Sequence, residues 1–251
     1  MLPESFLCVP IAHRALHDIT KGHPENSRAA IKAAIALGFG IEIDIQRSSD
    51  GEAMVFHDYD LGRLTDETGP VATRTAAELS AIPLRHGDEG IPTLAEVLDL
   101  VNGQVPLLIE VKDQDGALGP NIGPLEARIG EVLRGYSGPV AVMSFNPHSV
   151  AAMAEHAPEV PRGLTTCAFE GGDWPLIPEA RRMELRRIPD FERVGACFVS
   201  HDVNNLTAKP VMDLHANGHP ILCWTVRSSE IEQTARQVAD NITFEGYLPT
   251  T

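Results

Sequence analysis

The stretch SRAAIKAAIALGFGIEIDI, residues 27–45, carries the pattern that decides the fold. Residues 27–37 follow Asn26, a candidate cap, and place apolar side chains at helical spacing. Residues 39–45 then alternate isoleucine with other side chains, as a strand with two different faces does. A helix followed closely by such a strand is the repeating unit of an α/β fold.

The same alternation of short apolar runs and helical patterns continues along the chain. Strands are predicted for eight segments: 6–13, 39–45, 105–112, 139–145, 162–167, 195–201, 220–226 and 241–247. Helices are predicted between them at 27–37, 124–135, 146–156, 178–187, 208–218 and 228–239. Eight strands with intervening helices favour a closed (β/α)8 barrel, a TIM barrel, over an open doubly wound sheet.

The length and the spacing of these elements favour one domain. A chain of 251 residues with 43% hydrophobic content can bury one substantial core. Residues 58–104 are too long for a plain connection and carry two helical patterns, at 75–82 and 93–101. We therefore expect a single barrel domain over residues 1–251, with 58–104 as an insertion after the second strand.

Charge and composition limit the classes of partner. The net charge of -15 disfavours nucleic acid and anionic membranes, and it means that an anionic small substrate needs a local positive cluster or a metal. No apolar stretch reaches about 18 residues and the first residues lack a basic segment, so we expect neither membrane span nor signal peptide. The separated cysteines Cys8, Cys167, Cys197 and Cys223 indicate buried free thiols and a cytoplasmic protein. Nothing in the sequence indicates the oligomeric state.

Two of the predicted strands carry carboxylates among apolar residues. Glu42 and Asp44 share one face of the strand 39–45, and Glu110 shares a face with Lys112 in the strand 105–112. Three carboxylates suit a hard divalent ion such as Mg²⁺ or Ca²⁺ better than Zn²⁺. The alternatives are a solvated strand end for the first pair and an ordinary surface ion pair between Glu110 and Lys112.

Two histidines end apolar runs close to these strands. His13 follows the first predicted strand, with Arg14 beside it, and His57 follows the apolar pair Val55–Phe56. Either histidine alone would more often be structural than catalytic. Together with the carboxylates and the cations Arg14 and Lys112, they indicate metal-assisted displacement at phosphorus, in which imidazoles move protons and cations meet the anion.

The order of the motifs resembles glycerophosphodiester phosphodiesterases. Residues 13–65 contain His-Arg, then PEN with a small hydroxyl residue, Glu-x-Asp, Asp-Gly, His-Asp and a Leu-x-Arg-x-Thr tail, all in the order of that family's signature region. IEVK (109–112), SFNP (144–147), CWTV (223–226) and ITFEGYLP (242–249) resemble later strands of the same family. The resemblance covers nearly the whole chain.

The resemblance implies hydrolysis of a glycerophosphodiester to sn-glycerol 3-phosphate and an alcohol. It implies a general acid/base pair, a divalent cation (Mg²⁺, Ca²⁺ or Mn²⁺), phosphate contacts and an apolar wall for the alcohol. By position, His13 and His57 are the general acid/base pair, and Glu42, Asp44 and Glu110 are the metal ligands. Arg14 and Lys112 are the phosphate contacts. Trp224 is the apolar wall, and core packing is its alternative role. The chain departs from the family pattern at Ala15, where glycine is usual, and at Glu245, where aspartate is usual.

Several alternatives stay open at this point. The attacking group is either a glycerol hydroxyl or water, and either histidine could be the acid. A phospholipase D of the sphingomyelinase type has a similar layout, although such proteins are typically secreted and linked by disulfides. A barrel that binds phosphoesters without turnover is the third candidate.

Overall fold

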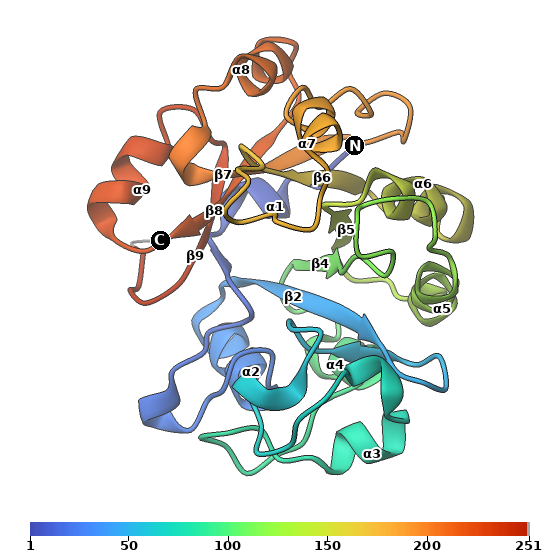
Figure 1. The fold of residues 1–251 in the computed structure, drawn as a ribbon. Helices are drawn as coiled ribbons and strands as arrows, with labels where there is room; N and C mark the ends of the chain where they lie inside the picture. Colours follow the sequence, from blue (N-terminus) through green and yellow to red (C-terminus); the bar gives the residue numbers. More distant parts are fainter. Residues whose placement is uncertain (250–251) are drawn as a thin grey trace.

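A closed ring of parallel strands forms the centre of the molecule (Figure 1). The computed structural model describes residues 1–249. β1 (Ile11–Ala12) pairs with both β2 (Gly40–Arg47) and β9 (Asn241–Phe244), which closes the ring. Between β2 and β9 lie, in order, β4 (Leu107–Val111), β5 (Val140–Ser144), β6 (Arg162–Thr166), β7 (Phe198–Asp202) and β8 (Ile221–Val226). The predicted (β/α)8 barrel is confirmed, and a short antiparallel strand, β3 (Ala53–Val55), lies beside β2.

Helices surround the strands (Figure 1). They are α2 (Arg28–Leu37), α4 (Leu94–Val101), α5 (Pro124–Leu133), α6 (Pro147–His156), α7 (Glu179–Leu185), α8 (Lys209–Ala216) and α9 (Ser229–Ala235). Their ends follow capping chemistry: the Ser27 hydroxyl accepts from the N–H of Ala30 at the start of α2, and Thr93 and Glu96 form a capping box on α4. Within residues 1–249, the structure has no helix with the length and apolar character needed to cross a bilayer.

The interior of the barrel is apolar toward the amino ends of the strands. Leu108, Ala141, Phe198 and Leu222 are fully buried there and belong to one cluster. Gly163 leaves room for the Phe198 ring, since a Cβ at this position would lie 2.5 Å from it. Because successive side chains of a strand point to opposite faces, the residues two positions beyond Leu108 and Phe198 face the same interior.

The first predicted strand, 6–13, is wrong over most of its length. Ser5–Cys8 form a helical turn, α1, and only Ile11–Ala12 are a strand. The buried Phe6 ring packs among the apolar side chains inside the barrel, and a short apolar run does not by itself distinguish a strand from a helix. Cys8 is exposed and Cys197 is partly exposed, so the expectation of buried thiols holds for Cys167 and Cys223 only.

Residues 58–104, expected as an insertion, divide into two parts. The first contains the short 3-10 turns η2 (Leu61–Arg63) and η3 (Val71–Thr73) and the helix α3 (Ala76–Ala81), which pack around a separate apolar cluster that includes Phe56. The second is α4, which lies against α2 and so occupies a place in the ring of helices. The stretch therefore supplies both an added lobe and a regular barrel helix.

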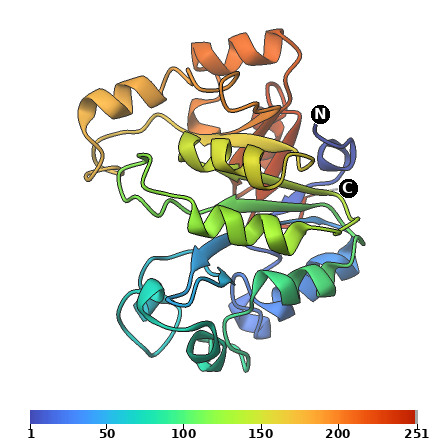
Figure 2. The ribbon, with the colours of Figure 1, turned by 90° about the vertical axis from the view of Figure 1, so that its right-hand side faces the viewer.

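The segments that follow the strands lie together at one end of the barrel. In Figure 2 the segment with η2, the loop after β4 and the loop after β6 all reach the left-hand side. α1 lies on the opposite side, near the N-terminus. The carboxyl ends of the strands therefore form one face, and in barrels of this kind that face carries the functional groups.

Candidate active site

Three buried carboxylates converge at the carboxyl ends of β2 and β4. Glu42 and Asp44 come from β2 and Glu110 from β4, where Asp44 and Glu110 are paired in register. One oxygen of each lies within 4.8 Å of the others. The structure thus brings the three predicted metal ligands together, and it excludes both a solvated strand end and a surface pair, because all three residues are buried.

Two cations lie against this group. Lys112 Nζ donates to Glu110 Oε1 at 2.8 Å and lies 3.3 Å from Asp44 Oδ1. Arg14 Nε lies 3.7 Å from Asp44 Oδ2. Burial opposes the charge of Lys112, but Glu110 and Asp44 raise the pKa of the ammonium above its ordinary value. Lys112 is therefore a fixed positive charge at the site.

The carboxylates still carry more negative charge than these cations balance. Burial, and then the neighbouring Asp44 and Glu110, raise the pKa of Glu42 well above its ordinary value. Burial acts in the same direction on Asp44, but Lys112, His57 and Arg14 lower the pKa of that carboxyl. Within this carboxylate cluster, Glu42 is therefore the group that favours an added proton or a neighbouring cation.

His13 is held by a carboxylate from the opposite end of the chain. Its Nδ1 lies 2.6 Å from Glu245 Oε2, and the other oxygen of Glu245 accepts from Arg227 Nε at 2.7 Å. Burial is the largest influence and lowers the pKa of His13, while the hydrogen bond with Glu245 opposes it. Because Nδ1 is engaged, Nε2 is the nitrogen left for proton exchange with a ligand.

His57 has a matching arrangement. Its Nδ1 lies 2.6 Å from Asp58 Oδ1, and Arg63 Nε donates to Asp58 Oδ2 at 2.6 Å. Burial alone would raise the pKa of Asp58, but the bonds from His57 and Arg63 lower it below its ordinary value. Each histidine therefore has a carboxylate on Nδ1 and an arginine behind that carboxylate.

Arg14 is fixed by side-chain and backbone contacts. Its Nη1 donates to Glu25 Oε1 at 2.8 Å, and its backbone N–H donates to Glu42 Oε2 at 2.8 Å. The guanidinium Nε is buried and has no hydrogen-bond partner in the described part of the chain. Arg14 and Ala15 both have positive φ, 53° and 62°, so the alanine occupies a backbone conformation that glycine adopts more easily.

All eight residues singled out in the sequence line one cavity of about 150 Å³. They are His13, Arg14, Glu42, Asp44, His57, Glu110, Lys112 and Trp224. Phe145, Thr225, Arg227 and Thr243, which sequence reasoning did not select, line it too. Asp58 directly follows His57, so the adjacent His-Asp pair in the sequence indicated the partner of His57. No local pattern in the sequence indicated Arg227.

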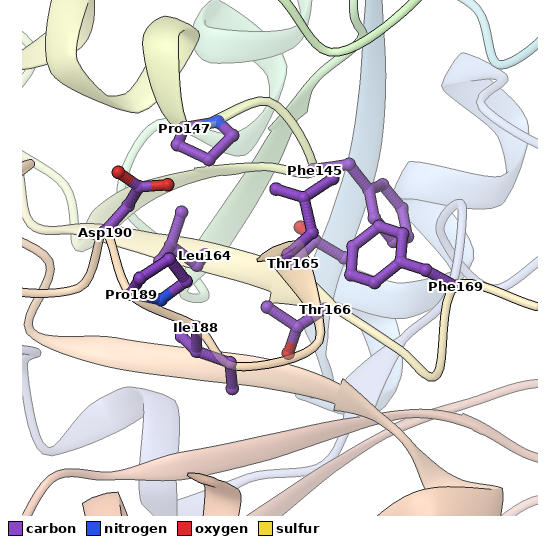
Figure 3. Close-up of a pocket in the computed structure, with 10 residues that line it drawn as sticks. Phe145, Pro147, Leu164, Thr165, Thr166, Phe169, Ile188, Pro189 and Asp190 are labelled. Carbon is purple, nitrogen blue, oxygen red and sulfur yellow. The ribbon is translucent and has the colours of Figure 1, made fainter. Parts of the chain in front are cut away.

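Trp224 lies both in an aromatic cluster and against the cavity. The indole Nε1 donates to the carbonyl of Ser200 at 3.0 Å, and the ring meets Phe145 edge-on at 5.5 Å between centroids. Phe145 is backed in turn by Phe169, at 6.2 Å, and the two rings lie close together in Figure 3. The Trp224 ring therefore packs in an aromatic cluster while it lines the cavity.

A much smaller void lies behind this aromatic cluster. Figure 3 shows it between Leu164–Thr166 of β6 and the segment Ile188–Asp190. Its volume is about 10 Å³, which is at most the space of one water molecule. This void is too small for a substrate, whereas the 150 Å³ cavity contains the carboxylates, the histidines and the cations and is the candidate active site.

Comparison with known proteins gives consistent results. The sequence pattern of the "Glycerophosphoryl diester phosphodiesterase family" matches residues 13–242. A glycerophosphodiester phosphodiesterase of Caldanaerobacter subterraneus subsp. tengcongensis is 30% identical over 92% of this chain and 91% of its own. The structure of an Oleispira antarctica phosphodiesterase in complex with the product sn-glycerol-3-phosphate is similar, with a TM-score of 0.77, 25% identity, and coverage of 96% of this chain and 94% of that one. A Thermotoga maritima glycerophosphodiester phosphodiesterase shares the fold, with a TM-score of 0.69 and 21% identity.

Proposed function

Because this chain belongs to the glycerophosphoryl diester phosphodiesterase family, we propose that its hydrolysis of glycerophosphodiesters takes place in the 150 Å³ cavity. The products would be sn-glycerol 3-phosphate and an alcohol. The observation that carries this proposal is the meeting of a buried carboxylate cluster with two carboxylate-bound histidines in one cavity. The product in the Oleispira antarctica structure supports the substrate class.

Glu42, Asp44 and Glu110 would hold a divalent cation. Their oxygens lie close enough to share one ion, and they are hard ligands. Burial and, after it, the negative charge of Asp44 and Glu110 raise the pKa of Glu42, which a bound cation would oppose. This donor set suits Mg²⁺, Ca²⁺ or Mn²⁺. When bound, such an ion would supply neutralisation of charge on the phosphate oxygens.

His13 and His57 would move the protons. One imidazole accepts a proton from the attacking hydroxyl or water, and the other donates a proton to the leaving oxygen. Both present Nε2 for this purpose, because Glu245 and Asp58 occupy Nδ1. The lowered pKa of His13 favours a neutral ring near pH 7, which is the state that a proton acceptor needs.

Arg14, Lys112 and Trp224 would bind the substrate. Lys112 is charged and fixed beside the carboxylates, and Arg14 Nε, which makes no hydrogen bond within residues 1–249, can donate to a phosphate oxygen. The ring of Trp224 offers an apolar surface to the organic part of the diester.

Turnover of glycerophosphocholine, measured as released glycerol 3-phosphate, tests the proposal. We expect His13→Ala and His57→Ala each to lower kcat by about 10²-fold to 10⁴-fold. An aryl phosphodiester with a p-nitrophenolate leaving group needs little protonation on departure, so it should restore the rate only in the variant that lacks the acid. His156→Ala is the control, because His156 lies at the end of α6 and does not line the cavity. Near wild-type turnover in both site variants would refute the two-histidine mechanism.

A further inference from the structure

A second, larger cavity opens directly from the active site. Its volume is about 790 Å³, and it shares His57, Glu110, Lys112 and Phe145 with the 150 Å³ cavity. Its outer part, which we call the apolar groove, is lined by Tyr59, Leu118 and Trp174–Ile177. These come from three loops at the carboxyl ends of the strands, so a ligand in the groove would reach the reacting atoms.

The groove presents large apolar side chains to solvent. Leu176 is 80% exposed and Tyr59 is 55% exposed, and both line the same cavity. Beneath them, Trp174 packs against Phe145 at 4.9 Å and Phe169 at 5.2 Å between ring centroids. The aromatic floor is thus fixed by packing, and the apolar rim has no covering side chain among the described residues.

The charged groups around the groove are mostly engaged elsewhere. Asp113 accepts backbone N–H groups from Gly116 and Leu118 and a side-chain bond from Asn146, so it shapes its own loop. Lys112 is engaged by the metal-site carboxylates. Two further acids, Asp60 and Asp173, line the same cavity. The groove therefore offers no cation for a second phosphate, and the surface of Tyr59, Leu118 and Trp174–Ile177 suits hydrocarbon.

We propose that the apolar groove binds the hydrocarbon part of the substrate, so that the preferred phosphodiesters carry an alkyl or acyl chain, as lysophospholipids do. This inference rests on the proposed function. The volume of the cavity supports the proposal, because cavities of roughly 300–1,000 Å³ enclose ligands much larger than a choline or ethanolamine group. The chain could be attached to the leaving alcohol or to the glycerol, and both attachments present the same chemistry to the groove.

Two substrate series, used below their micelle concentrations, test this. One lengthens the leaving alcohol from glycerophosphoethanol through the butyl to the octyl ester, and the other lengthens an acyl chain on glycerophosphocholine from acetyl to octanoyl. In one series we expect kcat/KM to rise about twofold to fourfold per added methylene until the groove is filled, in line with the transfer of methylene groups from water. The series that rises identifies the side of the phosphate that faces the groove.

Matched variants connect the effect to the groove. Leu176→Ser should flatten the rising series while leaving kcat/KM for glycerophosphoethanol within twofold, since this side chain is exposed and does not line the 150 Å³ cavity. Leu37→Ser is the control, because Leu37 is an exposed leucine at the end of α2 and does not line either cavity. Its chain-length dependence should match that of the wild type.

A binding measurement separates this inference from the proposed function. The chain has two tryptophans, Trp174 and Trp224, and both line these cavities, so their fluorescence reports on occupancy. In EDTA, monomeric dodecylphosphocholine should shift the emission of wild type and Leu37→Ser at lower concentration than that of Leu176→Ser. Equal titrations of all three proteins, or turnover that ignores chain length in both series, would overturn the groove assignment. Groove binding without turnover of any diester would overturn the proposed function instead.

Discussion

Replacing Glu245 by glutamine removes one charge from the His13 pair while keeping the size of the side chain. Glu245 Oε2 lies 2.6 Å from His13 Nδ1, and its carboxylate favours the protonated ring. Glu245 has two other contacts: Arg227, which is 60% exposed, so that its loss of an ion pair costs little stability, and His17, whose Nε2 lies 3.6 Å from Glu245 Oε2. The variant should therefore fold normally and differ mainly at His13.

The expected effect follows from the distance and the burial. A charge in direct contact shifts the pKa of a partner by about 1 to 3 units. Without the carboxylate, the pKa of the buried His13 should fall further, and one limb of the rate profile should move to lower pH by at least about one unit. Movement of the acidic limb identifies His13 as the base, and movement of the alkaline limb identifies it as the acid. Loss of orientation should also lower kcat by about 10²-fold, or about 2.7 kcal/mol in the barrier.

The assay is kcat and kcat/KM for glycerophosphocholine from pH 5 to 9. Glu245→Asp keeps the charge but withdraws it by one methylene, and it should retain more activity than the glutamine variant. Arg227→Met leaves the His13–Glu245 pair in place and removes the outer contact together with one positive charge that lines the cavity, and we expect less than a tenfold loss. If Glu245→Gln keeps kcat within threefold and neither limb moves, Glu245 does not act through His13.

Three further outcomes are expected. Excess EDTA should abolish turnover and lower the Tm, and Mg²⁺, Ca²⁺ or Mn²⁺ should restore both, because an ion bound to the carboxylates stabilises the folded state by mass action; full activity in EDTA would contradict the metal site. Arg14→Lys should lower kcat/KM more than tenfold, since an ammonium cannot keep both the contact with Glu25 and a phosphate contact; unchanged kinetics would remove Arg14 from the site. Burial lowers the pKa of His201 to about 4, whereas the unfolded side chain has a pKa near 6.5. The unfolded state therefore binds the extra proton between these values, and stability should fall by about 3 kcal/mol as pH drops from 6.5 to 4. Urea unfolding of His201→Gln should show a weaker pH dependence than the wild type, and equal dependence would refute the assignment.

The part of the site that lies on regular strands could be predicted from the sequence. Alternation in residues 39–45 and 105–112 placed Glu42 and Asp44 on one face of the first strand and Glu110 with Lys112 on one face of the second, and the two strands are neighbours in the barrel. His13 and His57 each directly follow an apolar run. This position predicted that each lies where its segment leaves the core. Period-2 patterning is a property of the strand itself, so it needs no knowledge of distant segments.

The parts that could not be predicted depend on contacts between distant segments or on irregular loops. Glu245 meets His13 across the closure of the ring, 232 residues away in sequence, and only the family pattern drew attention to it. The loop with Trp174 and Leu176 has no periodicity that would predict its position over the active site. The segment of α1 was predicted as a strand because a short apolar run does not distinguish a strand from a helix. The packing of Phe6 inside the barrel decides between the two.

The charges of the cavity explain how a chain with a net charge of -15 could bind an anionic diester. Distant surface charges matter little, because salt screens them over about 8 Å. Within the cavity, Arg14, Lys112 and Arg227 balance the three carboxylates, but Arg14 and Arg227 are also engaged by Glu25 and Glu245. The local balance is therefore negative until a cation is added. A divalent ion on the carboxylates would reverse that balance close to the proposed phosphate contacts Arg14 and Lys112, so the proposed cation would serve substrate affinity as well as chemistry.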